Sequence, residues 1–179
     1  HGLFFHTPDL ARIKGLALRA FYGPIARIGG SFFVADSRID RDQLIAAGRR
    51  EEVKFLVLSS DVVYPDGKMK DYERNFYLPF KGFEKPIYAI PGNHDWFDAN
   101  EGFNANFLTY EAAQRALRAR LAEDLQTEAV TTGERFDEIT AEAARLRAYY
   151  RVRNGLQRAP FFEMHAGGFS LVAADTGIL

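Results

Sequence analysis

Short apolar runs separated by helix-like segments make up the first hundred residues. The runs over 31–35, 53–58 and 86–90 are almost continuously apolar instead of alternating, which is typical of strands covered on both faces. Between them, segments 39–50 and 70–78 carry apolar residues at helical spacing. This order of strand, helix, strand, helix and strand predicts right-handed crossovers and a mainly parallel sheet, so the predicted fold class is α/β.

After the third strand the composition shifts to Ala, Arg, Glu and Leu, and apolar stripes recur at helical spacing. The stripes consist of Leu117, Leu121 and Leu125, and then of Phe136, Ile139, Ala143, Leu146 and Tyr150. Because residues 131–133 (Thr-Thr-Gly) lie between the stripes, the pattern predicts an antiparallel helical hairpin inserted over 110–157. A β-hairpin follows, with strands over 161–164 and 169–174 and a turn at 165–168.

The length of the chain favours one domain with its own core. We expect residues 1–179 (20.2 kDa) to form a single, incomplete domain, because the sequence does not begin with Met and stops after an apolar strand pattern. Residues 10–28 carry apolar residues at roughly helical spacing, interrupted by Gly and Pro, and predict one or two short helices.

Composition and charge exclude several classes of protein. Apolar residues make up 47% and charged residues 26%, which is ordinary for a soluble globular protein. The formal net charge is −1 and there is no basic stripe, which argues against a duplex-binding protein. No run approaches the about 20 apolar residues of a membrane helix, and the N-terminus lacks the features of a secretory signal. We therefore expect a soluble, cytoplasmic protein.

The candidate chemistry lies where three predicted strands end. Asp36 follows the first strand, Asp61 the second, and Asn93-His94-Asp95 the third. In an open α/β sheet the carboxyl ends of neighbouring strands converge on one crevice, where ligands bind. There is no cysteine, so any metal must be held by oxygen and imidazole, a ligand set that suits Mn, Fe, Zn or Mg. Two such cations need a bridging carboxylate, and together they can bind a phosphate and a hydroxide.

Two sequence strings resemble motifs of the calcineurin-like metallophosphoesterases, a superfamily that includes purple acid phosphatases and phosphodiesterases. Residues 88–95 (Tyr-Ala-Ile-Pro-Gly-Asn-His-Asp) resemble its Gly-Asn-His-Asp/Glu signature. Residues 58–65 (Leu-Ser-Ser-Asp-Val-Val-Tyr-Pro) resemble its Gly-Asp motif, in the version that is followed by Tyr-Pro. The motifs span roughly 32–98, and the strand that ends in Asp175-Thr176 extends the likeness.

The resemblance implies a partial four-layer αββα sandwich with an inserted helical hairpin, and a site with two divalent metal ions. By this likeness Asp61 would bridge the metals, Asn93 would ligate the second through its amide oxygen, and Asp36 would be a further ligand. His94 would contact the phosphate and protonate the leaving oxygen, and Asp95 would orient the imidazole. A metal-bound hydroxide would attack a phosphate mono- or diester.

The sequence also departs from the family pattern. Asp36-Ser37-Arg38 stands where the family has Asp-x-His, and Arg38 could bind phosphate oxygens or be a solvated residue at a helix start. Ser60 replaces the Gly before the bridging Asp. The family's further His and its Gly-His-x-His motif are not found up to Leu179, so we expect the fragment to bind metal weakly.

Simpler interpretations stay open beside these. The Gly-Asn-His-Asp string could be a capping loop, and Asp36 or Asp61 could be a residue of a strand-end turn. Trp96 and Phe97 could line the substrate cleft or pack beneath the loop. We do not expect His1, His6 or His165 to be metal ligands.

Two further functional hypotheses come from a different class. The chain could be a catalytically inactive phosphoesterase-fold module for binding or scaffolding, which Arg38 in place of the usual His favours. The hairpin over 110–157 could also dock a partner protein, alongside either role.

Overall fold

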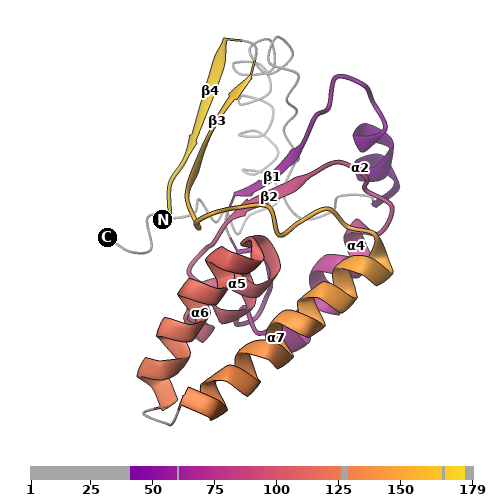
Figure 1. Ribbon diagram of the computed structural model, residues 1–179. Coiled ribbons are helices and arrows are strands. Elements are labelled where there is room, and N and C mark those ends of the chain that lie inside the picture. The colour runs from indigo at the N-terminus through magenta and orange to yellow at the C-terminus, as the bar shows by residue number, and fades with distance from the viewer. Residues whose placement is uncertain (1–40, 60, 126–128, 167, 176–179) are drawn as a thin grey trace, which may run out of the picture. The chain divides into compact units, whose positions relative to one another are not determined.

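The structure is a computed structural model, and it describes residues 41–59, 61–125, 129–166 and 168–175 (Figure 1). Contacts within the chain divide it into two compact units, residues 1–53 and residues 54–179. The predicted helices of 10–28 and the predicted strand over 31–35 lie outside the described residues.

The described part of the first unit contains helix α2 (Arg41–Gly48), which confirms the helix predicted over 39–50. Its apolar side chains Leu44 and Ile45 are buried, and Asp42 in the first turn suits the positive end of the helix dipole.

The second unit opens with a parallel strand pair. Strands β1 (Leu56–Ser59) and β2 (Ile87–Ile90) pair in parallel, as the apolar runs predict. A continuous helical segment joins them, made of α3 (Met69–Tyr72), the π-helical turn η1 (Glu73–Tyr77) and α4 (Leu78–Phe80). The helix predicted over 70–78 extends through Pro79 and ends at Phe80.

A side chain completes the free edge of β2. Gln157 is buried, and its amide group donates to the Ala89 carbonyl (2.9 Å) while its oxygen accepts from the Ala89 N–H (2.8 Å). The Ile87 N–H donates to the Arg153 carbonyl (2.8 Å). Buried backbone groups need partners, and these contacts supply them where no third strand pairs with β2 in the described residues.

In the part of the chain that the structure describes, four helices follow β2: η2 (Asp95–Asp98, a 3₁₀ turn), α5 (Glu101–Phe107), α6 (Tyr110–Leu125) and α7 (Ala129–Tyr150). The helical pair α6 and α7 confirms the predicted hairpin in part. Residues 131–133 were expected between the helices but lie inside α7. Helix α7 ends at Tyr150, and Arg153 then forms an isolated bridge with Pro86. Helix α5 was not predicted.

The apolar stripes of the hairpin form part of the core. Leu117, Phe136, Ala143 and Leu146 are each at most 1% exposed. Helices α6 and α7 pack on each other and on α5 (Figure 1). The side chains of Leu121 and Leu125 are not among those that the structure describes.

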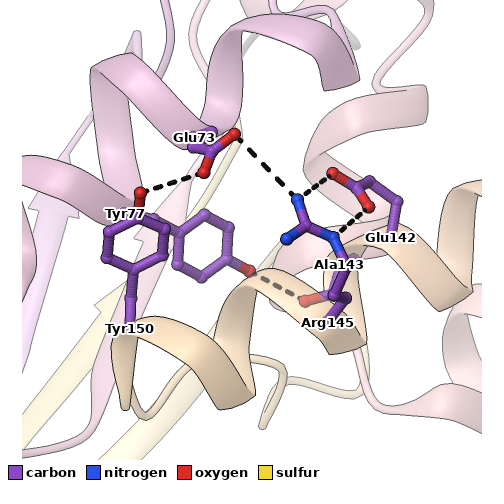
Figure 2. Close-up of polar contacts among 6 residues, drawn as sticks. All are labelled: Glu73, Tyr77, Glu142, Ala143, Arg145 and Tyr150. Atoms are coloured by element: carbon purple, nitrogen blue, oxygen red, sulfur yellow. Dashed lines mark hydrogen bonds and ion pairs between the residues drawn. The ribbon is translucent and has the colours of Figure 1, made fainter.

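Polar contacts also tie α7 to the π-helical turn η1. The Tyr150 hydroxyl donates to Glu73 (2.9 Å), and the Tyr77 hydroxyl lies 3.3 Å from the Ala143 carbonyl oxygen (Figure 2). Arg145 forms an ion pair with Glu142 (2.7 Å), and both of these side chains are partly exposed. The hairpin is therefore joined to the βαβ unit by both apolar and polar contacts.

The last two strands, β3 (Phe162–Ala166) and β4 (Phe169–Ala173), pair antiparallel with Phe162 opposite Ala173. They confirm the predicted β-hairpin. The Tyr88 and Phe162 rings, from β2 and β3, lie 5.6 Å apart between centroids. Of the helices that the structure describes, none is long and apolar enough to cross a membrane.

Candidate metal centre and active site

The register of the parallel pair brings the two sequence motifs to one edge of the sheet. Ser59 at the end of β1 lies opposite Ile90 at the end of β2. Asp61 follows two residues after β1, and Gly92 to Asp95 begin two residues after β2. The carboxyl ends of parallel strands thus carry both polar loops, as expected for a ligand site in an α/β fold.

The Asp61 carboxylate connects the two loops. Its Oδ1 accepts from the backbone N–H of His94 (3.2 Å), and its Oδ2 accepts from the Tyr64 hydroxyl (2.7 Å). Asp61 has a left-handed backbone (φ 43°), which is uncommon for a residue other than glycine and is best tolerated by Asn and Asp. The sharp turn directs the chain from β1 straight into the loop that faces His94.

Asp95 holds the same two loops together from inside. It is fully buried, and its Oδ2 accepts from the backbone N–H groups of Gly92 and Val62, both at 2.9 Å. Its Oδ1 accepts from the Val63 N–H at 3.3 Å. Burial raises the pKa of Asp95, and the three amide donors act in the opposite direction.

The imidazole of His94 is positioned by a backbone carbonyl. Its Nδ1 lies 2.5 Å from the carbonyl oxygen of Pro65, which can only accept, so Nδ1 carries a proton and Nε2 is left for other partners. Tyr64 and Phe97 flank the ring, with centroids 4.4 Å and 5.0 Å from it. We expected Asp95 to orient this imidazole; the Pro65 carbonyl has that position, and Asp95 instead bonds backbone amides.

The described residues supply only part of the expected metal ligands. Asp61 is half-buried at the sheet edge and Asn93 is exposed in the same loop cluster. Asp36 and Arg38 lie outside the described residues. Across the described part of the chain, no three His, Cys, Asp or Glu side chains form a group that could hold a metal ion. The oxygen ligands Asp61 and Asn93 fit a divalent cation in kind, and a complete site needs ligands beyond them.

Two residues of this cluster were missed by sequence reasoning. The Tyr64 hydroxyl contacts the candidate bridging carboxylate, and the Pro65 carbonyl holds the candidate acid. Both belong to the Asp-Val-Val-Tyr-Pro string, so the signal was present, but a backbone carbonyl leaves no mark in side-chain identity. His165, not expected to be a ligand, is exposed on β3 and contacts Ser170 (2.8 Å) and Glu163 (3.1 Å).

A protein-family model matches most of the chain. The family model described as calcineurin-like phosphoesterase matches residues 21–169, which include both strand-end loops. The chain belongs to the calcineurin-like phosphoesterases. Searches of the curated proteins and of the solved structures returned no match for it.

Membership gives the cluster a chemical context. Calcineurin-like phosphoesterases are in general hydrolases that use divalent metal ions. The mixed helix and strand content of this chain fits the family. The contact between Asp61 and the His94 N–H joins the two family-like strings in space, since the residues are 33 positions apart in sequence.

Proposed function

We propose that this chain carries the central part of the active site of a metal-dependent phosphoesterase, which hydrolyses a phosphate mono- or diester at a dinuclear centre. The observation that carries the proposal is the contact of the Asp61 carboxylate with the His94 backbone (3.2 Å), at the carboxyl edge of a parallel strand pair. Family membership supports phosphoester hydrolysis in general. The finer fold proposal is a partial αββα sandwich, with β1 and β2 in one of its sheets.

Asp61, Asn93 and Asp36 would hold the metal ions, with Asp61 as the bridge. When bound, such ions polarise the phosphate and lower the pKa of a coordinated water. In this role Asp61 would have to exchange its Tyr64 hydrogen bond for a cation, or keep it on one oxygen. The half-buried position of Asp61 leaves its carboxylate within reach of a ligand.

His94 would serve as the acid for the leaving oxygen. Because the Pro65 carbonyl accepts the hydrogen bond from Nδ1–H, the imidazolium form would donate its second proton from Nε2. Asp95 would be a positioning residue, since its three amide contacts fix the loop that carries His94. Arg38 would bind phosphate oxygens.

Hydrolysis of p-nitrophenyl phosphate and bis-p-nitrophenyl phosphate with added Mn²⁺, by the full-length protein, tests the proposal. Asp61→Asn should lower kcat by roughly 100-fold or more, because an amide is a poor bridging ligand. Asp137→Asn is the matched control, since Asp137 is an exposed carboxylate on α7. Equal activity of the Asp61 variant and the wild type would contradict the role of Asp61.

The alternative is an inactive phosphoesterase-fold module. It is favoured by Arg38 at the place of a family histidine. Elemental analysis separates the two functions. Full-length protein that contains no metal and turns over neither substrate would support the module and exclude the enzyme.

A further inference from the structure

A cavity of about 520 Å³ is lined in part by the Phe97 ring, and the proposed chemistry leaves it unused. Its polar and aromatic lining comes from four elements and the residue before one of them: Lys68 and Lys70 at the start of α3, Trp96, Phe97 and Asp98 of η2, Glu101 of α5, and Arg135 of α7. The Phe97 ring also packs against the His94 imidazole, with centroids 5.0 Å apart. Phe97 therefore links the cavity to His94, because the ring lines one and contacts the other. The volume lies in the range of small-molecule sites.

One wall of the cavity is aromatic. Phe97 is 64% exposed, so its ring is accessible to a ligand. Trp96 is half-buried, and its indole N–H donates to Asp175 (3.2 Å), so the ring is held in place. A ring that is held in place beside a ring that is accessible suits a flat ligand, because stacking needs an open aromatic surface.

The rim of the cavity carries three cations and two carboxylates, Asp98 and Glu101. The Arg135 guanidinium pairs with Glu101 (3.0 Å) and Lys68 pairs with Asp66, which leaves both near the cavity with part of their charge balanced. Lys70 is exposed and makes neither of these pairs. The cations of the lining outnumber its carboxylates by one, and Lys70 beside two aromatic rings suits a ligand that combines a flat ring with negative charge.

We propose that this cavity binds the leaving group of the phosphate ester, and that the leaving group is of the nucleotide class, with an aromatic base and a phosphate of its own. The base would stack on Phe97 and Trp96, and the phosphate would lie near Lys70 and Arg135. This proposal rests on the proposed function, because it assigns the substrate class of the same site.

The intrinsic fluorescence of Trp96 tests it directly, since this is the single tryptophan of the sequence. The chain is titrated in EDTA with ADP, with adenosine (base without charge) and with pyrophosphate (charge without base). ADP should quench Trp96 and bind about tenfold more tightly than either part, because only ADP uses both halves of the cavity. No quenching by ADP, or pyrophosphate binding as tightly as ADP, would overturn the proposal.

Variants separate the two halves of the cavity. Phe97→Ala should weaken ADP binding by about 5- to 150-fold, the range expected for loss of one stacking partner. Phe161→Ala is the matched control, because Phe161 is 59% exposed and is not part of the lining. Lys70→Gln should weaken ADP by up to about fivefold and leave adenosine unchanged. Equal effects of the two phenylalanine variants would contradict the assignment.

The two proposals fail in different ways. ADP binding in EDTA does not need the metal ions, so it is measured apart from hydrolysis. If Asp61→Asn leaves hydrolysis intact while ADP still binds at the Phe97 wall, the proposed function is wrong and the cavity is a nucleotide site without that chemistry. If hydrolysis depends on Asp61 but Phe97→Ala leaves ADP affinity unchanged, the enzyme stands and the substrate class is wrong.

Discussion

Three aspartates near the candidate site differ in what surrounds each carboxylate. Asp61 is half-buried and accepts from a backbone amide and a phenol, whereas Asp95 is fully buried and accepts from three amides. Asp98 accepts from the Gly102 N–H (3.1 Å), while its Oδ1 is buried without a hydrogen-bond partner among the described residues. Identical side chains therefore have different roles: Asp61 is a candidate metal ligand, Asp95 holds the two loops together, and Asp98 is a buried acid with a raised pKa.

The raised pKa of Asp98 predicts that the stability of the protein depends on pH. Burial raises the pKa of Asp98 to about 7, above its value of about 3.9 in an unfolded chain. The folded state thus binds the proton more tightly, so the contribution of Asp98 to the free energy of unfolding is greatest at low pH and falls as the pH rises from about 4 to about 7. Asp98→Asn should flatten this loss.

Urea midpoints at pH 5, 6, 7 and 8 measure the effect. The wild type should lose stability relative to Asp98→Asn as the pH rises, and the two curves should run parallel above pH 8. Asp137→Asn, an exposed carboxylate, should follow the wild type at each pH. Parallel curves for the wild type and Asp98→Asn from pH 5 to 7 would show that Asp98 titrates normally.

At this scale the sequence indicated which residues gather but not all of their contacts. Asp61 and His94 could be brought together because strand order and motif spacing are visible in the sequence. The partners of Asp95 could not, since they are backbone amides of Val62 and Val63, 33 and 32 positions away. Backbone donors have no side-chain identity, so only the fold reveals them.

Among the elements, helix α5 shows why one prediction was missed. Residues 102–107 are all buried, so the helix has no polar face and gives no amphipathic pattern. It also contains Gly102, Asn104 and Asn106, which have low helix propensity. The packing compensates for the propensity: a Cβ on Gly102 would lie 2.2 Å from the Gly67 carbonyl oxygen, so glycine is required for the close approach.

The same reasoning explains the wrong boundary at 131–133. Thr-Thr-Gly is a common break signal, but α7 extends through it because the apolar face of the helix packs on α6. A glycine inside a helix costs about 1 kcal/mol relative to alanine, which tertiary packing readily exceeds. The long stripes on α6 and α7 and the apolar strands β1 and β2 were predicted, because their periodicity is produced by the same burial that stabilises them.

Gly102 in α5 and Gly133 in α7 predict opposite effects of substitution by alanine on stability. Gly102→Ala should lower the free energy of unfolding by about 1–3 kcal/mol or more, because the backbone of Gly67 must move. Gly133→Ala should raise it by up to about 1 kcal/mol, since the nearest atom to an added Cβ is 3.9 Å away. Chemical denaturation measures both. A stabilised Gly102→Ala would mean that α5 and the Gly67 turn are not in close contact.

On the scale of the whole molecule, the hairpin changes how its proposed docking role can be tested. If the hairpin over 110–157 is a docking arm, deleting it should abolish association and leave a folded sheet, whereas an unfolded product would mean that the hairpin is part of the core. In the unit of residues 54–179, however, α7 packs on η1 and α5, and the buried Asn154 amide that follows it donates to the Tyr77 hydroxyl (3.0 Å). Deletion would therefore remove core and partner surface together.

The hairpin prediction follows from that packing. Replacing residues 110–150 with a short linker should abolish cooperative unfolding of the remaining chain, because it exposes the buried faces of Tyr77 and Phe107. Phe136→Ala should reproduce the cause on a smaller scale, with a loss of about 3–5 kcal/mol, since Phe136 is fully buried. Tyr149→Ala should change stability by less than about 1 kcal/mol, because this side chain is 68% exposed.

Differential scanning calorimetry and near-ultraviolet circular dichroism distinguish the outcomes. A deletion variant that unfolds cooperatively, with an intact near-ultraviolet spectrum, would show that the hairpin is an appended arm and that its contacts with η1 contribute little. If the deletion variant does not fold, Tyr149→Ala tests the docking proposal instead, because this substitution leaves the core intact. Partner association that survives this and other substitutions on the exposed face of α7 would remove docking from the functions of the hairpin and leave it a structural part of the phosphoesterase domain.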